Sequence, residues 1–206
     1  MTLGTRSLLF GAHQFLLHPL FVLLAWVRLY GLPGPSALVA IVVHDWGYWG
    51  CRSMDGDDGA GHPLRCTWWL LILGLRRTAE LVEGHSRFAC ARHGIPMSRL
   101  FWADKLGTAL MPAWLWVLLS RASGELAEYL ANTAFEIHGD VTPTEFFWRY
   151  RGFVRHLLAT SKDPACRSLA QSWTPRCLCA GLMDAASAPN VIQVVVPRNI
   201  PTPSLN

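Results

Sequence analysis

The sequence contains little charge: Asp, Glu, Lys and Arg make up only 16% of its 206 residues, whereas 51% are hydrophobic. Disordered chains show the opposite composition, with few apolar residues and a high net charge, so global disorder is excluded. A chain of this length can bury the core of one domain. We therefore expect a folded protein with a large apolar core.

The motifs of several enzyme classes are also missing. The chain has no phosphate-binding loop of the form Gly-x-x-x-x-Gly-Lys-Ser/Thr, no Rossmann glycine fingerprint and no Gly-x-Ser-x-Gly elbow. Nucleotide-dependent kinases and serine hydrolases are therefore not expected. The six cysteines include no Cys-x-x-Cys pair, which argues against a zinc ribbon or a small disulfide scaffold and favours a reducing, cytoplasmic location.

A clean membrane span or signal peptide is lacking as well. The longest N-terminal stretch without a charged residue runs from Ser7 to Val27, which is about the length of a membrane-crossing helix. It contains His13, His18 and Pro19, however, and polar groups are costly at the centre of a bilayer. It also has no small-residue cleavage site. We therefore expect no membrane partner.

Helical patterns dominate, and the alternation typical of strands does not occur before the last twenty residues. Proline at a helix start and glycine after its end predict a helix from Pro19 to Tyr30 that stops at Gly31. The Gly- and Asp-rich segment 51–63 is expected to be a loop. Further helices are predicted over residues 37–45, from 68 onward, and over 78–93, 98–119 (bent at Pro112), 123–135 and 144–160.

The composition shifts toward Ser, Pro and Ala after residue 162. The short apolar run 191–196 in this part is flanked by prolines and stands apart from the helical patterns. We therefore predict an all-α fold: a helical bundle over residues 1–162, followed over residues 163–206 by an irregular, peripheral and partly disordered tail.

Two acids stand in apolar surroundings. Asp45 and the adjacent His44 follow the hydrophobic segment 37–43, and Asp104 lies on a helical face whose other positions are apolar or glycine. A carboxylate in a protein core must be paired with a cation, hydrogen-bonded or bound to a metal. Both acids are therefore candidates for a buried metal site, or for pairing with an arginine.

Histidines accompany these acids along the chain, in the order His18, His44-Asp45, His62, His85 and Asp104. Imidazole and carboxylate together suit divalent transition metals such as manganese, iron, cobalt or zinc. A single histidine is more often structural than a ligand, but the combined order favours a shared site. His13 competes with His18 for the first position; we favour His18 because it precedes Pro19 at a helix start.

This order resembles the HD-domain superfamily of metal-dependent phosphohydrolases, whose helical fold carries a ligand histidine, an adjacent His-Asp pair and a later aspartate on separate helices. The matching residues are His18, His44-Asp45 and Asp104, and the resemblance covers roughly residues 13–130. The sequence departs from the family at Tyr48, where many members have a lysine. The resemblance predicts an HD-domain-like helical bundle.

The resemblance also implies one or two divalent ions, with manganese, iron, cobalt, magnesium and zinc as candidates. His62 and His85 resemble the extra histidines of members with two metals; without a second ion they would orient the substrate. Asp45 would be a ligand and would anchor the attacking water. The acid that moves a proton is expected at Asp55, Asp57 or Asp58, in the loop 51–63. The composition of this loop is equally typical of a solvated turn.

The implied substrate is a small phosphorylated compound, foremost a nucleotide or deoxynucleotide. Arg87, Arg99 and Lys105 are the nearest basic neighbours of the ligands and are expected to bind its phosphates, although ordinary surface charge is an equal alternative. Two other functions stay open: a di-iron oxygenase of HD type, and a membrane-associated or binding protein with structural histidines. A homo-oligomer is compatible with the sequence.

Arginines and aromatic residues are interleaved over residues 146–156, as they are in some nucleic-acid-binding faces. We interpret this segment as an amphipathic helix with its aromatic side chains packed inward and its arginines in solvent. No nucleic-acid partner is therefore expected. The tryptophans at 68, 69, 114 and 116 are interpreted as core residues.

Overall fold

The computed structural model describes residues 1–131 and 141–173. Within these two ranges the chain forms helices and contains no strand, which confirms the all-α prediction. The helices are, in chain order, α1 (Leu3–Phe10), α2 (Leu17–Tyr30), α3 (Pro35–Val43), the short 3-10 helix η1 (Trp46–Tyr48), α4 (Asp57–Ala60), α5 (His62–Ile72), α6 (Arg76–Glu83), α7 (Arg87–His93), α8 (Arg99–Leu110), α9 (Ala113–Ser123), α10 (Glu125–Ala131), α11 (Pro143–Ala159) and α12 (Pro164–Ser172).

Several helix boundaries differ from the prediction, for local reasons. The predicted helix 78–93 is divided into α6 and α7, because Ser86 accepts a hydrogen bond from the N–H of Ala89 and starts a new helix. His85 is thereby left in the turn between the two helices. α5 begins at His62, earlier than predicted, with Pro63 in its first turn.

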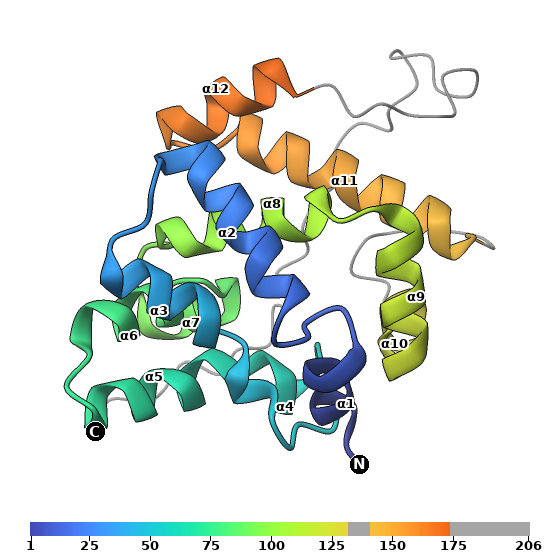
Figure 1. The fold of residues 1–206 in the computed structure, drawn as a ribbon, viewed down its shortest axis with the longest axis horizontal. Coiled ribbons are helices and arrows are strands. Elements are labelled where there is room, and N and C mark those ends of the chain that lie inside the picture. Colours follow the sequence, from blue (N-terminus) through green and yellow to red (C-terminus); the bar gives the residue numbers. More distant parts are fainter. Residues whose placement is uncertain (132–140, 174–206) are drawn as a thin grey trace, which may run out of the picture.

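α2 and α8 lie side by side at the centre of the molecule and make the most extensive helix–helix contact among the described residues (Figure 1). Their close approach requires Gly107 on α8, since a Cβ at this position would lie 2.8 Å from the Cα of Val22 on α2. Helices α11 and α12 cover one side of this pair, and α3 and α6 cover the other.

The helix α12 continues the core beyond residue 162. Its Cys166 and Ala170 are buried within the main cluster of apolar side chains. The hydroxyl of Tyr30, at the end of α2, donates a hydrogen bond of 3.0 Å to the carboxylate of Asp163, which caps α12. The rest of the predicted tail, including the apolar run 191–196, lies outside the described residues.

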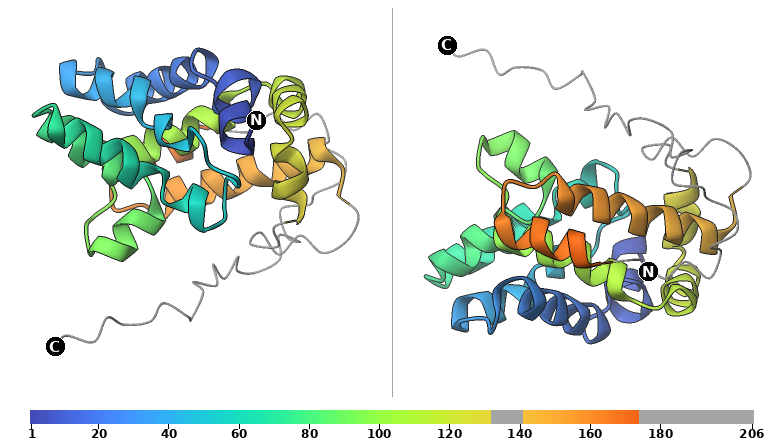
Figure 2. Two further views of the ribbon diagram at one scale, coloured as in Figure 1. Left: turned by 90° about the horizontal axis from the view of Figure 1, so that it is seen from below. Right: turned by 90° about the horizontal axis from the view of Figure 1, so that it is seen from above.

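The amphipathic prediction for the segment 146–156 is confirmed except at Arg151, which is half-buried and donates from Nε to the carbonyl of Ala109 at 2.6 Å. In α11 the side chains of Phe146, Phe147 and Phe153 are buried, whereas Arg149 and Arg155 are exposed. Helix α11 packs on α8 and α9 (Figure 2). Helix α11 therefore has a structural role, with its aromatic side chains in the core of the bundle.

The prediction that the tryptophans belong to the core is right for one residue and wrong for three. Trp116 is 4% exposed, but Trp68, Trp69 and Trp114 are 61%, 44% and 69% exposed. These three residues occupy the outward faces of α5 and α9, so they contribute little to the packing of the described core.

The described part of the chain contains no helix that combines the length and the hydropathy needed to cross a membrane. The long uncharged stretch from Ser7 to Val27 is divided between α1 and α2. Its apolar residues therefore form two separate helices.

Candidate metal centre

The end of α3 places two of the predicted ligands. This short apolar helix stops at Val43, His44 follows as its C-cap, and Asp45 precedes η1. His44 is fully buried and Asp45 is 6% exposed. Because the chain turns at this point, both side chains point away from the apolar surface of α3 and into the centre of the bundle.

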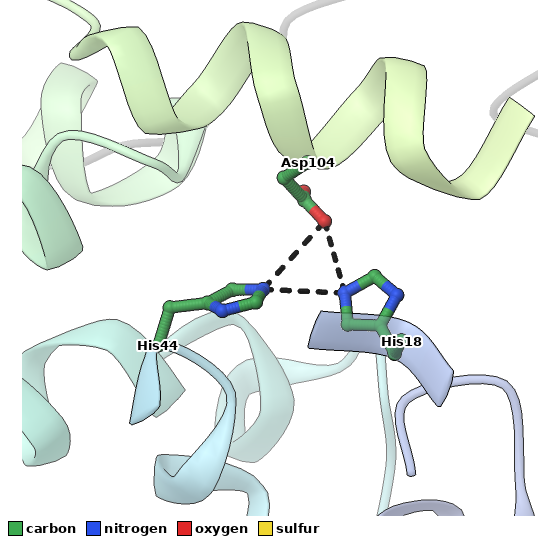
Figure 3. Close-up of side chains that lie close together, drawn as sticks. All are labelled: His18, His44 and Asp104. Carbon is green, nitrogen blue, oxygen red and sulfur yellow. Dashed lines mark hydrogen bonds and ion pairs between the residues drawn. The ribbon is translucent and has the colours of Figure 1, made fainter. Parts of the chain in front are cut away.

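Four ligand atoms from three helical regions converge there. The Nε2 atom of His18 lies 3.1 Å from Asp45 Oδ2, 3.2 Å from Asp104 Oδ1 and 3.2 Å from the Nε2 of His44. The Nε2 of His44 lies 3.3 Å from Asp45 Oδ2 and 3.7 Å from Asp104 Oδ1. Figure 3 shows His18, His44 and Asp104 pointing toward one another from α2, the end of α3 and α8.

A second group uses the other oxygen of Asp45. The Nε2 atoms of His62 and His85 lie 3.1 Å apart, and they lie 3.4 Å and 3.7 Å from Asp45 Oδ1. His62 is the first residue of α5, and His85 stands in the turn between α6 and α7. Asp45 is thus shared by two groups of ligand atoms, one on each of its oxygens.

The orientation of three imidazoles is fixed by backbone carbonyls. Nδ1 of His44 donates to the carbonyl of Ile41 at 2.9 Å, and Nδ1 of His62 donates to that of Gly59 at 2.7 Å. Nδ1 of His85 likewise donates to the carbonyl of Val82. In the neutral form of each ring, which is the form that binds a metal, the proton is held on Nδ1, and Nε2 presents a lone pair to the centre.

The donor set fits a metal ion. Ligand atoms about 2.1 Å from a shared ion lie about 3.0–3.4 Å apart at octahedral or tetrahedral angles, close to the 3.1–3.7 Å found here. Asp45 Oδ2 accepts no hydrogen bond from any described residue, although two Nε2 atoms lie beside it. Two facing Nε2 lone pairs repel unless a cation lies between them. The cluster could therefore hold a metal ion.

The electrostatics of the metal-free cluster reflect its density of carboxylates. Burial lowers the pKa of His44, but Asp45 and Asp104 outweigh burial and raise this pKa to about 10. Burial would raise the pKa of the Asp45 and Asp104 carboxyls. His44 and His18 nevertheless hold the pKa of Asp45 well below its usual range. Lys105 and His18 do the same for Asp104. Both acids are therefore ionised and ready to bind a cation.

The second group differs from the first. Burial, followed by the charge of His85, lowers the pKa of His62 to about 4, although Asp45 acts in the opposite direction. His62 is therefore neutral near pH 7, which is the form that binds a metal. Its place is set by Gly47, because a Cβ on Gly47 would lie 1.9 Å from the carbonyl oxygen of His62.

The basic residues predicted to bind phosphate take different places. Lys105 donates to Asp104 Oδ2 at 2.8 Å, so it supports a ligand directly. Arg87, at the start of α7, lies over the ring of Phe153 at 5.8 Å, and its charge acts on Lys105. Arg99 stacks over the ring of Tyr30 at 5.1 Å, about 18 Å along α2 from His18. The structure brings Lys105 to the cluster, and it leaves Arg99 away from it.

The acids of the predicted loop lie outside the cluster. Asp58 forms ion pairs with Arg52 at 3.5 Å and Arg65 at 3.2 Å. Asp55 is exposed, and its backbone N–H donates to Glu128 at 2.8 Å. The charge of Asp55 acts on the buried Tyr48. The side chain of Asp57 is outside the described residues.

Sequence reasoning named His13 and Tyr48 but missed the contacts that each of them makes beside the centre. His13 lies next to the cluster, with its ring 5.3 Å from that of His18, and its Nδ1 is 3.2 Å from the fully buried carboxylate of Glu125. Burial lowers the pKa of His13, but Glu125 raises it to about 9. Tyr48, where many members of the family have lysine, stacks on His62 with ring centroids 3.7 Å apart. No sequence pattern links residues so far apart.

Comparisons with models of protein families, with curated proteins and with solved structures yield no match to this chain. The resemblance to the HD-domain superfamily therefore rests on the order of the six His and Asp residues in the sequence, together with their convergence in the fold.

Proposed function

We propose that this protein is a metal-dependent phosphohydrolase of HD type that cleaves a phosphate ester or anhydride of a small substrate, foremost a nucleotide or deoxynucleotide. The observation that carries the proposal is the convergence of two groups of ligand atoms on the two oxygens of Asp45. The chain order of these ligands is the feature on which the resemblance rests.

Two divalent ions suit this arrangement, and they would share Asp45. The first would be held by His18, His44, Asp45 and Asp104, and the second by His62, His85 and Asp45. The mixture of nitrogen and oxygen ligands favours manganese, iron, cobalt or zinc.

When bound, divalent ions in such a site neutralise the charge on phosphate oxygens and lower the pKa of a coordinated water. The chain itself keeps bulk water away, since the six proposed ligands are at most 6% exposed. Charges act more strongly in such an environment than they do in water. Arg87, whose charge acts on Lys105, would add a positive charge for the phosphate of a substrate.

The geometry supports His13 as the group that transfers a proton to the leaving oxygen. Glu125 holds its Nδ1, its side chain is 20% exposed, and its ring lies beside that of His18. Neither Asp55 nor Asp58 is positioned in this way. We expect His13→Gln to lower kcat about a hundredfold or more without changing the bound metal, and Asp58→Asn to leave kcat unchanged, as measured by phosphate release and metal analysis.

Metal analysis of the purified full chain, followed by a phosphate-release screen, tests the proposal. Chelator-treated protein would be reloaded with manganese, cobalt or iron and assayed on nucleoside mono- and triphosphates. We expect up to two ions per chain, and phosphate release only after reloading. A chain that binds no metal, or that is loaded and inactive on every phosphorylated compound, would contradict the proposal.

The same ligands would also suit the di-iron oxygenase of the sequence analysis, because carboxylate and imidazole are ligands of non-haem iron. Oxygen uptake by the iron-loaded chain separates the two reactions. Phosphate release without oxygen uptake supports hydrolysis, whereas an oxygen-dependent product with no phosphate release supports the oxygenase.

A further inference from the structure

One edge of the molecule carries a dense group of exposed apolar side chains. They lie at the end of α5 and in the turn to α6, a segment over residues 68–77 that we call the α5–α6 tip. Soluble proteins usually expose large apolar residues singly, and a contiguous group marks an interaction site. Those of the tip are at least 41% exposed: Trp68, Trp69, Leu71, Ile72, Leu73 and Leu75.

The helix α5 has two apolar faces with different surroundings. On its inner face Cys66 and Leu70 are buried in the core, in line with His62 at the metal centre. On its outer face Trp68 and Ile72 are 61% and 64% exposed. A surface helix is ordinarily polar on its outer side. The packing of the described core therefore does not explain the apolar residues of the outer face.

The charge near the tip is positive. Arg76 and Arg77 directly follow the apolar residues, and both are exposed. The chain contains no Asp or Glu between Asp58 and Glu80, and Asp58 is paired with arginines. The tip thus combines exposed tryptophans and aliphatic side chains with unpaired positive charge at its end, as far as the described residues show.

A second apolar segment lies at the same edge. Figures 1 and 2 place the loop between α2 and α3 at the same end of the molecule as the turn between α5 and α6. Leu32 in that loop is 89% exposed, and Leu38 on α3 is 45% exposed. The first 44 residues contain no Asp or Glu, so this side of the edge is also free of negative charge.

We propose that the α5–α6 tip docks the protein on the surface of an anionic membrane. Tryptophan and aliphatic side chains would enter the boundary between headgroups and acyl chains, which tryptophan prefers. Arg76 and Arg77 would lie at the lipid phosphates. The protein would lie on the bilayer and not cross it, so the proposal differs from the spanning segment that the sequence argues against.

A second copy of the chain fits the tip less well than a lipid surface does. In a two-fold symmetric contact the same patch meets itself, so Arg76 and Arg77 of the two copies would come together without an acid of the tip between them. The tip is also the projecting end of a helix (Figure 2), a shape that enters a soft surface. These features favour lipid as the occupant.

Flotation of the full chain with vesicles tests the proposal. The vesicles would contain phosphatidylcholine alone or phosphatidylcholine mixed with phosphatidylglycerol. We expect binding to the anionic vesicles, weaker binding at high salt, and a loss of about fivefold in the partition coefficient for each of Arg76→Gln and Arg77→Gln. Trp68→Ser combined with Ile72→Ser should lower it more than tenfold.

The matched control removes the same side-chain types elsewhere. Trp114 and Leu118 on α9 are 69% and 57% exposed, and Trp114→Ser with Leu118→Ser should leave flotation unchanged. Circular dichroism of each variant shows that it is folded. The conservative pair Trp68→Phe and Trp69→Phe should keep the binding but lose most of the fluorescence quenching by brominated lipid.

Three results would overturn the proposal. The wild-type chain could fail to float with anionic vesicles, or the α9 control could lose as much binding as the tip variant. The tip variant could instead abolish a concentration-dependent dimer, measured by sedimentation without lipid, while vesicle binding stays at the wild-type level. That last result would assign the tip to a contact between copies of the chain.

Discussion

The two groups of the candidate metal centre are held by different parts of the fold. His18 and Asp104 belong to α2 and α8, the helix pair at the middle of the bundle, and their positions depend on the contact of Gly107 with Val22. His62 and His85 stand at a helix start and in a turn. The first group is thus fixed by the packing of the whole core, and the second is fixed by local backbone.

This difference has a consequence for the chemistry. A change in the contact between α2 and α8 alters the distances among His18, Asp104 and Asp45, and it costs stability as well. A change at His62 or His85 affects only one side of Asp45. We therefore expect substitutions in the first group to weaken both metal binding and the stability of the fold. Substitutions in the second group should change the rate of the reaction with little effect on the fold.

Asp45→Ala should have the largest effect, because it removes the residue that both groups share. We expect the bound metal to fall to nearly none and phosphate release to fall about a thousandfold or more, since bound ions contribute several kcal/mol to such reactions. Circular dichroism should show the helix content unchanged. If Asp45→Ala keeps its metal and its activity, the shared ligand has been assigned to the wrong residue.

His18→Ala and His62→Ala separate the two groups. We expect His62→Ala to retain one ion per chain, and His18→Ala to lose the ion that stabilises the core. Added manganese should therefore raise the melting temperature of His62→Ala more than that of His18→Ala. Metal analysis and thermal unfolding measure both effects, and equal losses in the two variants would show that the groups are not distinct.

The stability of the metal-free protein should decrease as the pH falls from 6.5 to 4. The pKa of His62 is lowered from 6.5 to about 4 in the folded state, so over this interval only the unfolded chain takes up that proton. The expected loss in the free energy of unfolding is about 3 kcal/mol. The low-pKa carboxyls of Asp45 and Asp104 lose their contribution only at lower pH.

At alkaline pH the loss of stability comes from His13 and His44. Their pKa values are raised to about 9 and about 10, so their contributions are complete below pH 6.5 and are lost as the pH rises through 9 and 10. Urea unfolding at a series of pH values measures the loss of stability at both ends of the pH range. His62→Gln should reduce the loss at acidic pH and leave the loss at alkaline pH unchanged. An unchanged loss at acidic pH would show that another group is responsible.

Gly107→Ala should cause the smallest of these effects. The added Cβ would lie 2.8 Å from the Cα of Val22, so α2 and α8 must separate, at a cost of about 1–3 kcal/mol. Gly152 on α11 is the control, since a Cβ there meets nothing within 4 Å; Gly152→Ala should stabilise by about 0.5–1 kcal/mol. Metal affinity should fall only in Gly107→Ala, and a fall in both would contradict the proposed role of the helix contact.

The helical fold and the six proposed ligands could be predicted from the sequence. Asp104 was found because an acid on an apolar helical face needs a partner. The turn that carries His85 was missed, because the cap at Ser86 is a weaker signal than the helical pattern around it. The pair of His13 and Glu125 was also missed, because residues more than a hundred positions apart meet only through tertiary packing.

The backbone supports of the imidazoles have one more consequence. His44, His62 and His85 each donate to the carbonyl of the residue three positions earlier. A carbonyl is present at every position of a chain, so no side-chain substitution can delete these acceptors. The tautomer of each histidine is therefore protected against most point mutations, and only a change in the local path of the chain would release it.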